Sequence, residues 1–116
     1  MSDEPQTSRL TLEIERTPEA ATVRCRGKLV AGVNDFLYTK VRDLMQDHNR
    51  IVLDLTDLTH MDSMGLGAIV RLYVTAKAKG CALELINVGP RIRQIFGVSN
   101  LLSIFSLVGE NQIRMH

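Results

Sequence analysis

The order of hydrophobic patterns along the chain constrains its fold more than any other feature. Residues 10–14 and 21–25 alternate apolar and polar side chains, which is typical of half-buried strands, and "TPEA" between them is a turn signal. The two runs predict an antiparallel hairpin. After the hairpin, strand-like runs alternate with helix-like runs. This order predicts an α/β fold whose remaining strands are mostly parallel and joined by right-handed crossovers.

Three further strands are predicted after the hairpin: "RIVLDL" at residues 50–55, "CALELINV" at 81–88, and a short strand within "LLSIFSLV" at 101–108. The first is nearly continuously apolar, which is typical of a strand buried on both faces in a central parallel position. We therefore expect one domain, residues 9–116, after a flexible tail at residues 1–8. Its mixed, mostly parallel sheet should have about five strands with helices packed on it. "GENQIRMH" leaves little room for a full final helix.

Three helices are predicted from apolar residues at helical spacing. The first is capped by Asn34 or Asp35 and runs to about His48. The second covers about residues 64–79, where the next residue is a glycine suited to end it. The third begins at Pro90, a residue that suits a first helical turn. The residues expected to face the core are Leu37, Val41 and Leu44 in the first helix, Leu66, Ile69, Val70 and Tyr73 in the second, and Ile92, Ile95 and Phe96 in the third.

Composition excludes several functional classes. With 14 basic and 13 acidic residues and a net charge of +1, the chain has no footprint of a nucleic-acid or membrane-surface protein. No apolar run approaches the roughly 20 residues that a membrane span needs, and the polar, acidic N-terminus does not resemble a signal peptide. Cys25 and Cys81 lie far apart within apolar runs, which predicts two reduced, buried thiols. Together these features favour a soluble, cytoplasmic domain.

The stretch "THMDSMGLGAIV" contains the candidate functional site. Ser63 follows a predicted strand and a connecting loop, at the start of a predicted helix, where α/β proteins collect their functional residues. The first amides of a helix lack internal partners and tolerate a phosphate, which would add roughly 1.5 to 2 negative charges and could repel a docked partner. Alternatively, Asp62 or Ser63 is simply the N-cap of the helix. Gly65 and Gly67 are expected to permit tight strand–helix packing and close approach of a partner.

Catalysis at this serine is a weaker hypothesis. His60, Asp54 and Asp62 are available as a base or an orienting acid, but "MDSMG" lacks the glycine that precedes the serine by two residues in a nucleophile elbow. The three histidines show no metal-ligand spacing, and "GLG" lacks the rest of a dinucleotide-binding fingerprint. The sequence therefore predicts no catalytic residue, no cofactor and no metal.

One face of the second helix is predicted to bind a partner. On a helical wheel, Met64, Ala68, Arg71 and Thr75 lie opposite the expected inner stripe, with Leu72 at its flank. This face carries no acidic residue and begins with a methionine, an adaptable side chain that suits contact surfaces. Because it adjoins Ser63, we expect it to form an interface.

The segment from Ile51 to Leu101 resembles the STAS domain of anti-sigma-factor antagonists. The most diagnostic pieces are "VLDLTDLTHMDSMGLG", "KGCALELINV" and "IRQIFGVSNL", and the match extends over residues 10–108. The D-S-x-G-L core after a hydrophobic strand is the family's phosphorylation motif. The resemblance implies that Ser63 is the phosphoacceptor and Asp62 its neighbouring acid, with Gly65 and Leu66 in the same loop and helix start.

The resemblance also implies a partner-switching cycle. The unphosphorylated antagonist binds an anti-sigma factor that is also a serine kinase, is released when that kinase phosphorylates it with ATP, and is reset by a metal-dependent serine phosphatase. The antagonist itself is not an enzyme. The residues expected to contact the kinase are Asp62, Met64, Gly65, Leu66, Ala68, Arg71 and Leu72. The alternative is a STAS scaffold or transporter-associated subunit that is not phosphorylated.

Two departures from the family pattern bear on partner choice. Many relatives have acidic residues in a "G-E-L-D" stretch that ends the second strand, whereas this chain reads "GKLV", with Lys28 and Val30 in their place. That stretch borders the phosphorylation site in the family, so a different partner preference is expected. Met64 stands where a second serine often follows the phosphoacceptor.

Overall fold

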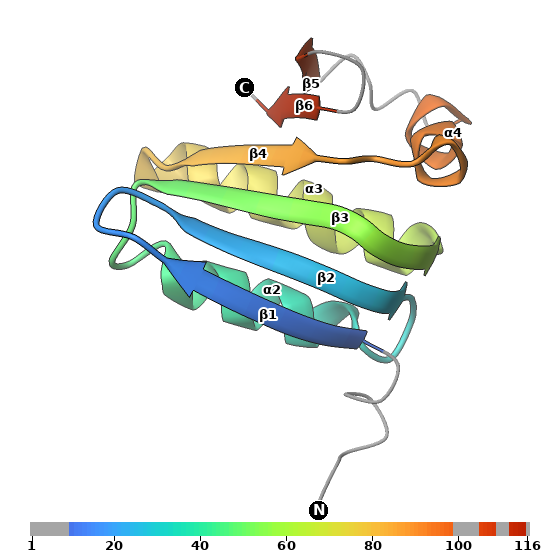
Figure 1. Ribbon diagram of the computed structural model, residues 1–116, viewed down its shortest axis with the longest axis horizontal. Helices are drawn as coiled ribbons and strands as arrows, with labels where there is room; N and C mark the ends of the chain where they lie inside the picture. The colour runs from blue at the N-terminus through green and yellow to red at the C-terminus, as the bar shows by residue number, and fades with distance from the viewer. Residues whose placement is uncertain (1–9, 99–104, 109–111, 116) are drawn as a thin grey trace, which may run out of the picture.

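A computed structural model describes residues 10–98, 105–108 and 112–115. Six strands form one sheet in the order β1-β2-β3-β4-β6-β5, and α2 and α3 lie side by side on one of its faces (Figure 1). In chain order the elements are β1 (Leu10–Arg16), β2 (Ala21–Leu29), α2 (Asn34–Leu44), β3 (Arg50–Met61), α3 (Ser63–Lys79), β4 (Ala82–Ile86), α4 (Pro90–Val98), β5 (Phe105–Val108) and β6 (Gln112–Met115).

The pairing of the strands confirms the predicted mixed sheet with an N-terminal hairpin. β1 pairs with β2 antiparallel, and β3 lies between β2 and β4, parallel to both. The predicted mostly parallel character is limited to the centre of the sheet. Among the described strands only β2, β3 and β4 pair in parallel, because β6 pairs antiparallel with β4 and β5 antiparallel with β6. The sheet has six strands and not about five, since residues 112–115, which the sequence did not assign to an element, form the strand beside β4. A four-residue strand is too short to show periodicity.

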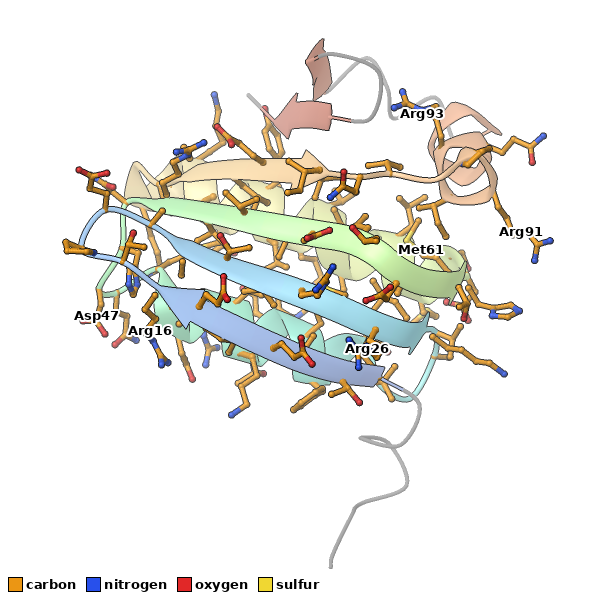
Figure 2. All side chains as sticks on the ribbon, in the orientation of Figure 1. Arg16, Arg26, Asp47, Met61, Arg91 and Arg93 are labelled. Atoms are coloured by element: carbon orange, nitrogen blue, oxygen red, sulfur yellow. The ribbon has the colours of Figure 1, made fainter. Side chains whose placement is uncertain are left out.

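The core lies between the sheet and the two helices on its inner face. Ile51, Leu53 and Leu55 of β3 point toward the helices and are almost completely buried. The stripe predicted for the first helix is confirmed, since all three of its residues are buried. The opposite face of the sheet is polar, and Figure 2 shows Arg26 on that face, pointing away from α2 and α3. Apolar and polar residues therefore alternate along β1 and β2 because each strand has one face in the core and one polar face, as predicted.

The ends of α2 differ from the prediction. Its N-cap is Val33, without a side-chain hydrogen bond, and the side chain of Asn34 instead accepts from the backbone N–H of Gly32 at 3.3 Å. The Asn34 side chain thus accepts a hydrogen bond from the turn before the helix and not from the first helical turn. Asp35 lies within the helix. α2 ends at Leu44, a turn earlier than expected.

The buried face of α3 is rotated from its predicted position. Leu66 and Ile69 are buried as expected, but Val70 and Tyr73 are only half-buried. Ala68, predicted on the outer face, and Leu72, predicted at its flank, are 1% and 0% exposed. The reason is that α3 packs against α2 as well as against the sheet, so its buried arc extends toward the neighbouring helix. In α4, Ile92 is buried as predicted, whereas the side chains of Ile95 and Phe96 lie outside the described residues.

Candidate functional site at the start of the third helix

The central strand leads directly into the candidate site. β3 continues through the polar stretch after "RIVLDL" as far as Met61, so the connecting loop that we predicted before Ser63 is absent. Its second half is held in the sheet by pairing with β2, for example Lys28 beside His60. Asp62 alone separates β3 from α3, and Ser63 is the first helical residue. The candidate phosphoacceptor therefore lies at the carboxyl end of the central strand.

Asp62 is the N-cap of α3, which decides between the two capping residues that the sequence left open. Its Oδ1 accepts a hydrogen bond from the backbone N–H of Gly65 at 3.0 Å, and its Oδ2 accepts from the backbone N–H of Ala31, also at 3.0 Å. Its own N–H donates to the carbonyl oxygen of Leu29 at 3.3 Å. A single residue thus ties the loop between β2 and α2 to the start of α3.

The protonation of Asp62 follows from these contacts. Burial acts to raise the pKa of the carboxyl, but hydrogen bonds from the backbone N–H groups of Ala31, Gly65 and Met64 outweigh that effect and hold the pKa below its usual range. The carboxylate is therefore ionised at neutral pH. It adds a fixed negative charge to the positive end of the helix dipole.

Gly65 and Gly67 serve different purposes. A Cβ on Gly65 would lie 2.1 Å from the carbonyl oxygen of Leu29, so only glycine lets the first turn of α3 approach the end of β2 this closely. The predicted tight strand–helix packing is therefore confirmed at Gly65. A Cβ on Gly67 would have no neighbouring atom within 4 Å. Packing within the described residues does not explain that glycine.

Ser63 is free to react because its neighbour supplies the cap. The residue is exposed, and within residues 10–98 its hydroxyl takes part in no hydrogen bond. No acidic residue lies in the first turn of α3. A phosphate on Ser63 would thus sit at a helix N-terminus, where unpaired amides favour an anion, and would not displace the existing cap.

The exposed residues of α3 near Ser63 include the apolar Met64 and the basic Arg71. Met64 is 51% exposed, an unusual exposure for a large apolar side chain. The Arg71 guanidinium is held 3.0 Å from a carboxylate oxygen of Asp35 and stacks 4.2 Å above the ring centre of Tyr38. Thr75 is half-buried, and its hydroxyl forms a hydrogen bond with that of Tyr38 at 2.9 Å.

Only some of the residues predicted to contact a partner are accessible. Met64 and Arg71 are exposed, and Asp62 is partly so. Gly65 and Leu66 are buried in the packing of α3. The burial of Ala68 and Leu72 shows that the predicted helical wheel was wrong for these two residues, whereas Leu66 lies on the inner stripe that the wheel predicted. Ala31, which holds the other oxygen of Asp62, was missed, because no local sequence pattern reports a contact across 31 residues.

The groups considered for catalysis have other partners. The ring nitrogen Nδ1 of His60 lies 2.9 Å from the hydroxyl of Thr59. Asp54 accepts hydrogen bonds from Thr56 and from the amide of Asn87, both at the far side of the sheet from α3. No arrangement of base and acid around Ser63 is seen among the described residues.

The described residues show neither a metal-ligand cluster nor a membrane-spanning helix, and their two cysteines are free thiols. Within the described part of the chain no group of three or more His, Cys, Asp or Glu side chains could hold a metal ion. No helix there is long and apolar enough to cross a bilayer. Cys25 and Cys81 are both free and buried, as predicted. Burial, with a smaller contribution from the charge of Asp54, raises the pKa of the Cys25 thiol to about 12.

The parallel centre of the sheet, the helices on one face, and Ser63 exposed next to the cap of α3 at the end of β3 together define a STAS domain. The STAS domain family matches residues 11–114, and the chain belongs to this family. It is 29% identical over 100 residues to the anti-sigma F factor antagonist of Paenibacillus polymyxa, an alignment that covers 84% of this chain and 86% of that protein.

Solved structures show the same fold. The unphosphorylated anti-sigma factor antagonist SpoIIAA superposes with a TM-score of 0.68 at 24% identity, covering 78% of this chain and 82% of that one. The murine anion transporter Slc26a9 contains a similar domain, with a TM-score of 0.67 at 16% identity over 77% of this chain and 15% of the transporter. The fold is thus shared by regulators and by a part of a transporter, and function has to be argued from the site.

Proposed function

We propose that the protein is an anti-sigma-factor antagonist that works by partner switching in the cytoplasm. In its unphosphorylated form it binds an anti-sigma factor that has serine kinase activity, which frees a sigma factor. The protein has no catalytic role or cofactor of its own and does not contact nucleic acid. Its similarity over most of its length to an anti-sigma F factor antagonist supports this role.

The observation that carries the proposal is the division of labour between Asp62 and Ser63. The aspartate caps the helix, so the serine hydroxyl is exposed and free for modification. In the proposed reaction the Ser63 Oγ attacks the γ-phosphorus of ATP bound to the kinase. The new O–P bond forms as the bond to ADP breaks, and a base of the kinase takes the hydroxyl proton. A serine phosphatase later hydrolyses the phosphate.

Phosphorylation of Ser63 is expected to release the kinase because of the charge of the phosphate and its position beside the contact surface. The phosphate adds roughly 1.5 to 2 negative charges at the edge of a contact surface that includes Met64 and Arg71. Juxtaposed like charges and lost contacts in an interface cost several kcal/mol, so we expect the affinity to fall at least about tenfold.

The test begins with the protein from its own cells. Phosphopeptide mapping, with and without a serine-phosphatase inhibitor, is expected to place phosphate on Ser63. Ser63→Ala should bind the kinase and stay bound in ATP, while Ser63→Asp should bind weakly. Thr39→Ala removes an exposed hydroxyl from α2 and serves as the matched control. Binding that survives stoichiometric phosphorylation of Ser63 would refute the proposal.

The likeness to a domain of Slc26a9 favours one other candidate, a scaffold or transporter-associated subunit. In that case Ser63 would carry no phosphate under any growth condition, and the protein would copurify with a large assembly regardless of ATP. The same phosphopeptide experiment therefore separates the two candidates.

A further inference from the structure

The loop between β2 and α2 folds into a tight turn close to Ser63. The N–H of Val33 donates to the carbonyl oxygen of Val30 at 3.1 Å, which closes a four-residue turn over residues 30–33. Its third residue, Gly32, has a φ of 98°, the left-handed conformation that this position of a type II turn requires and that glycine adopts readily. Its two central residues are exposed. We name residues 30–33 the loop turn.

Asp62 holds the loop turn from 31 residues away. The bond that closes a β-turn does not use the N–H of its second residue, which therefore needs an acceptor from elsewhere. Here the N–H of Ala31 donates to Oδ2 of Asp62 at 3.0 Å. The N–H of Asp62 donates in turn to the carbonyl oxygen of Leu29, the residue before the loop turn. The other carboxylate oxygen caps α3 at Gly65, so one side chain joins two segments.

The start of α2 contributes less to the order of the loop turn. The N-cap of α2 is Val33, which makes no side-chain hydrogen bond. Asn34 accepts the N–H of Gly32 at 3.3 Å with a neutral amide oxygen. The bond from Ala31 to the Asp62 carboxylate is shorter and charge-assisted, so it is the stronger of these two side-chain contacts.

We propose that Asp62 is a positioning residue for the phosphorylation of Ser63, an inference that rests on the proposed function. Its hydrogen bond to Ala31 keeps the loop turn closed next to the hydroxyl that the kinase must reach. Without that bond the turn samples open conformations, and only the closed fraction fits the kinase. A smaller binding-competent fraction weakens the apparent affinity in proportion and leaves the chemical step unchanged.

Two substitutions keep the cap of α3 and remove the bond to the loop turn, because asparagine and serine are both preferred N-caps. In Asp62→Asn the amide oxygen can accept from Gly65, but the NH₂ group then faces the N–H of Ala31, and two donors do not pair. In Asp62→Ser the single hydroxyl oxygen caps the helix. Asp47→Asn is the matched control, because it removes the same charge from an exposed position at the opposite end of the molecule from Met61 (Figure 2).

A proline at the second position of the loop turn provides a rescue. Proline is favoured at this position because its ring fixes φ at about −65°, and it has no N–H to leave unpaired. Ala31→Pro combined with Asp62→Asn should therefore close the turn without restoring the carboxylate. If Asp62 acted instead through direct contact with the kinase, this double variant would stay as defective as Asp62→Asn. The rescue thus separates positioning from contact.

Amide hydrogen exchange, followed by NMR on the purified full chain, tests the order of the loop turn without a partner. The N–H of Val33 should exchange at least about tenfold faster in both Asp62 variants, since a hydrogen bond to a charged group is lost. The N–H of Leu66, which donates to the carbonyl oxygen of Asp62 at 2.9 Å, should keep its protection. The double variant should return Val33 to the wild-type rate. Unchanged exchange at Val33 would overturn the inference, and so would equal losses at Val33 and Leu66, which would mean that Asp62 acts as a cap alone.

Steady-state kinetics with ATP and the kinase that copurifies with Ser63→Ala test the effect on phosphorylation. Both Asp62 variants should raise KM for the protein at least about tenfold and change kcat by less than about twofold, with Asp47→Asn unchanged. The double variant should recover the wild-type KM. A wild-type KM in both Asp62 variants, despite faster exchange at Val33, would overturn the inference and leave the proposed function standing. Failure of the proposed function has a different signature, the absence of phosphate from Ser63 of the wild-type protein.

Discussion

Gly65 and Gly67, two positions apart in α3, are expected to respond in opposite ways to replacement by alanine. A Cβ on Gly65 would lie 2.1 Å from the carbonyl oxygen of Leu29, whereas ordinary contact begins at 3.4 Å, so the helix and the strand would have to separate by about 1.3 Å. That carbonyl also accepts the N–H of Asp62, so it cannot withdraw without breaking a hydrogen bond. A Cβ on Gly67 meets nothing.

The magnitudes follow from these two environments. Gly67→Ala should raise the free energy of unfolding by roughly 0.5 to 1 kcal/mol, the helix-propensity difference between the two residues. Gly65→Ala gains the same propensity but introduces overpacking, which typically costs about 1 to 3 kcal/mol, and it disturbs a cap worth about 1 kcal/mol. The expected net loss is about 1 to 3 kcal/mol, so the free energies of unfolding of the two variants should differ by at least about 1.5 kcal/mol.

Urea unfolding followed by far-ultraviolet circular dichroism measures this difference, and thermal midpoints should separate by roughly 4 °C or more per kcal/mol. The double variant should equal the sum of the single changes if Gly67 has no contact with the first turn. Wild-type stability of Gly65→Ala would refute the close approach of α3 to β2. Destabilisation by Gly67→Ala would show that the outer face of α3 is covered in the free protein.

Three further predictions concern Asp62, Ser63 and Cys25. Asp62→Ala should lower the free energy of unfolding by about 1 to 2 kcal/mol at pH 7, because it removes the cap of α3 and the bond to Ala31. The pKa of Asp62 is lowered in the fold, so the Asp62 carboxylate makes its full contribution to the free energy of unfolding above the unfolded pKa of about 3.9. That contribution is lost as the pH falls through the lower folded pKa. The urea midpoints of wild type and Asp62→Ala should therefore converge as the pH falls through the folded pKa. Ser63→Ala should change stability by less than about 0.5 kcal/mol, because Ser63 is not the cap, and a larger loss in the same titration would contradict that assignment. The Cys25 thiol, buried and with its pKa raised to about 12, should resist alkylation by iodoacetamide at pH 8 until urea unfolds the chain, as measured by mass spectrometry.

The sequence predicted those features that local patterns encode. The alternation of apolar and polar residues predicted the hairpin, and Gly80 predicted the end of α3. The Asp-Ser pair predicted the start of α3 but left open which of the two residues is its cap. The features it missed depend on neighbours distant in the chain. β3 continues through a polar stretch because β2 pairs with it, and α3 buries Leu72 because α2 lies beside it. A helical wheel assumes one buried side, whereas this helix has two packing partners.

The same division between cap and phosphoacceptor determines how the proposed switch should behave thermodynamically. An anion at the first residue of a helix interacts favourably with its dipole, typically by 0.3 to about 1 kcal/mol. Because the cap of α3 belongs to Asp62, a phosphate on Ser63 removes no hydrogen bond of the described residues. The phosphorylated protein should therefore be as stable as the unmodified protein or slightly more so, while its affinity for the kinase falls. Urea unfolding of the purified phosphoprotein, with the dephosphorylated sample as control, makes the comparison. A loss of more than about 1 kcal/mol on phosphorylation would mean that release results from unfolding of the helix start, and the negative charge added to an intact surface would no longer explain the switch.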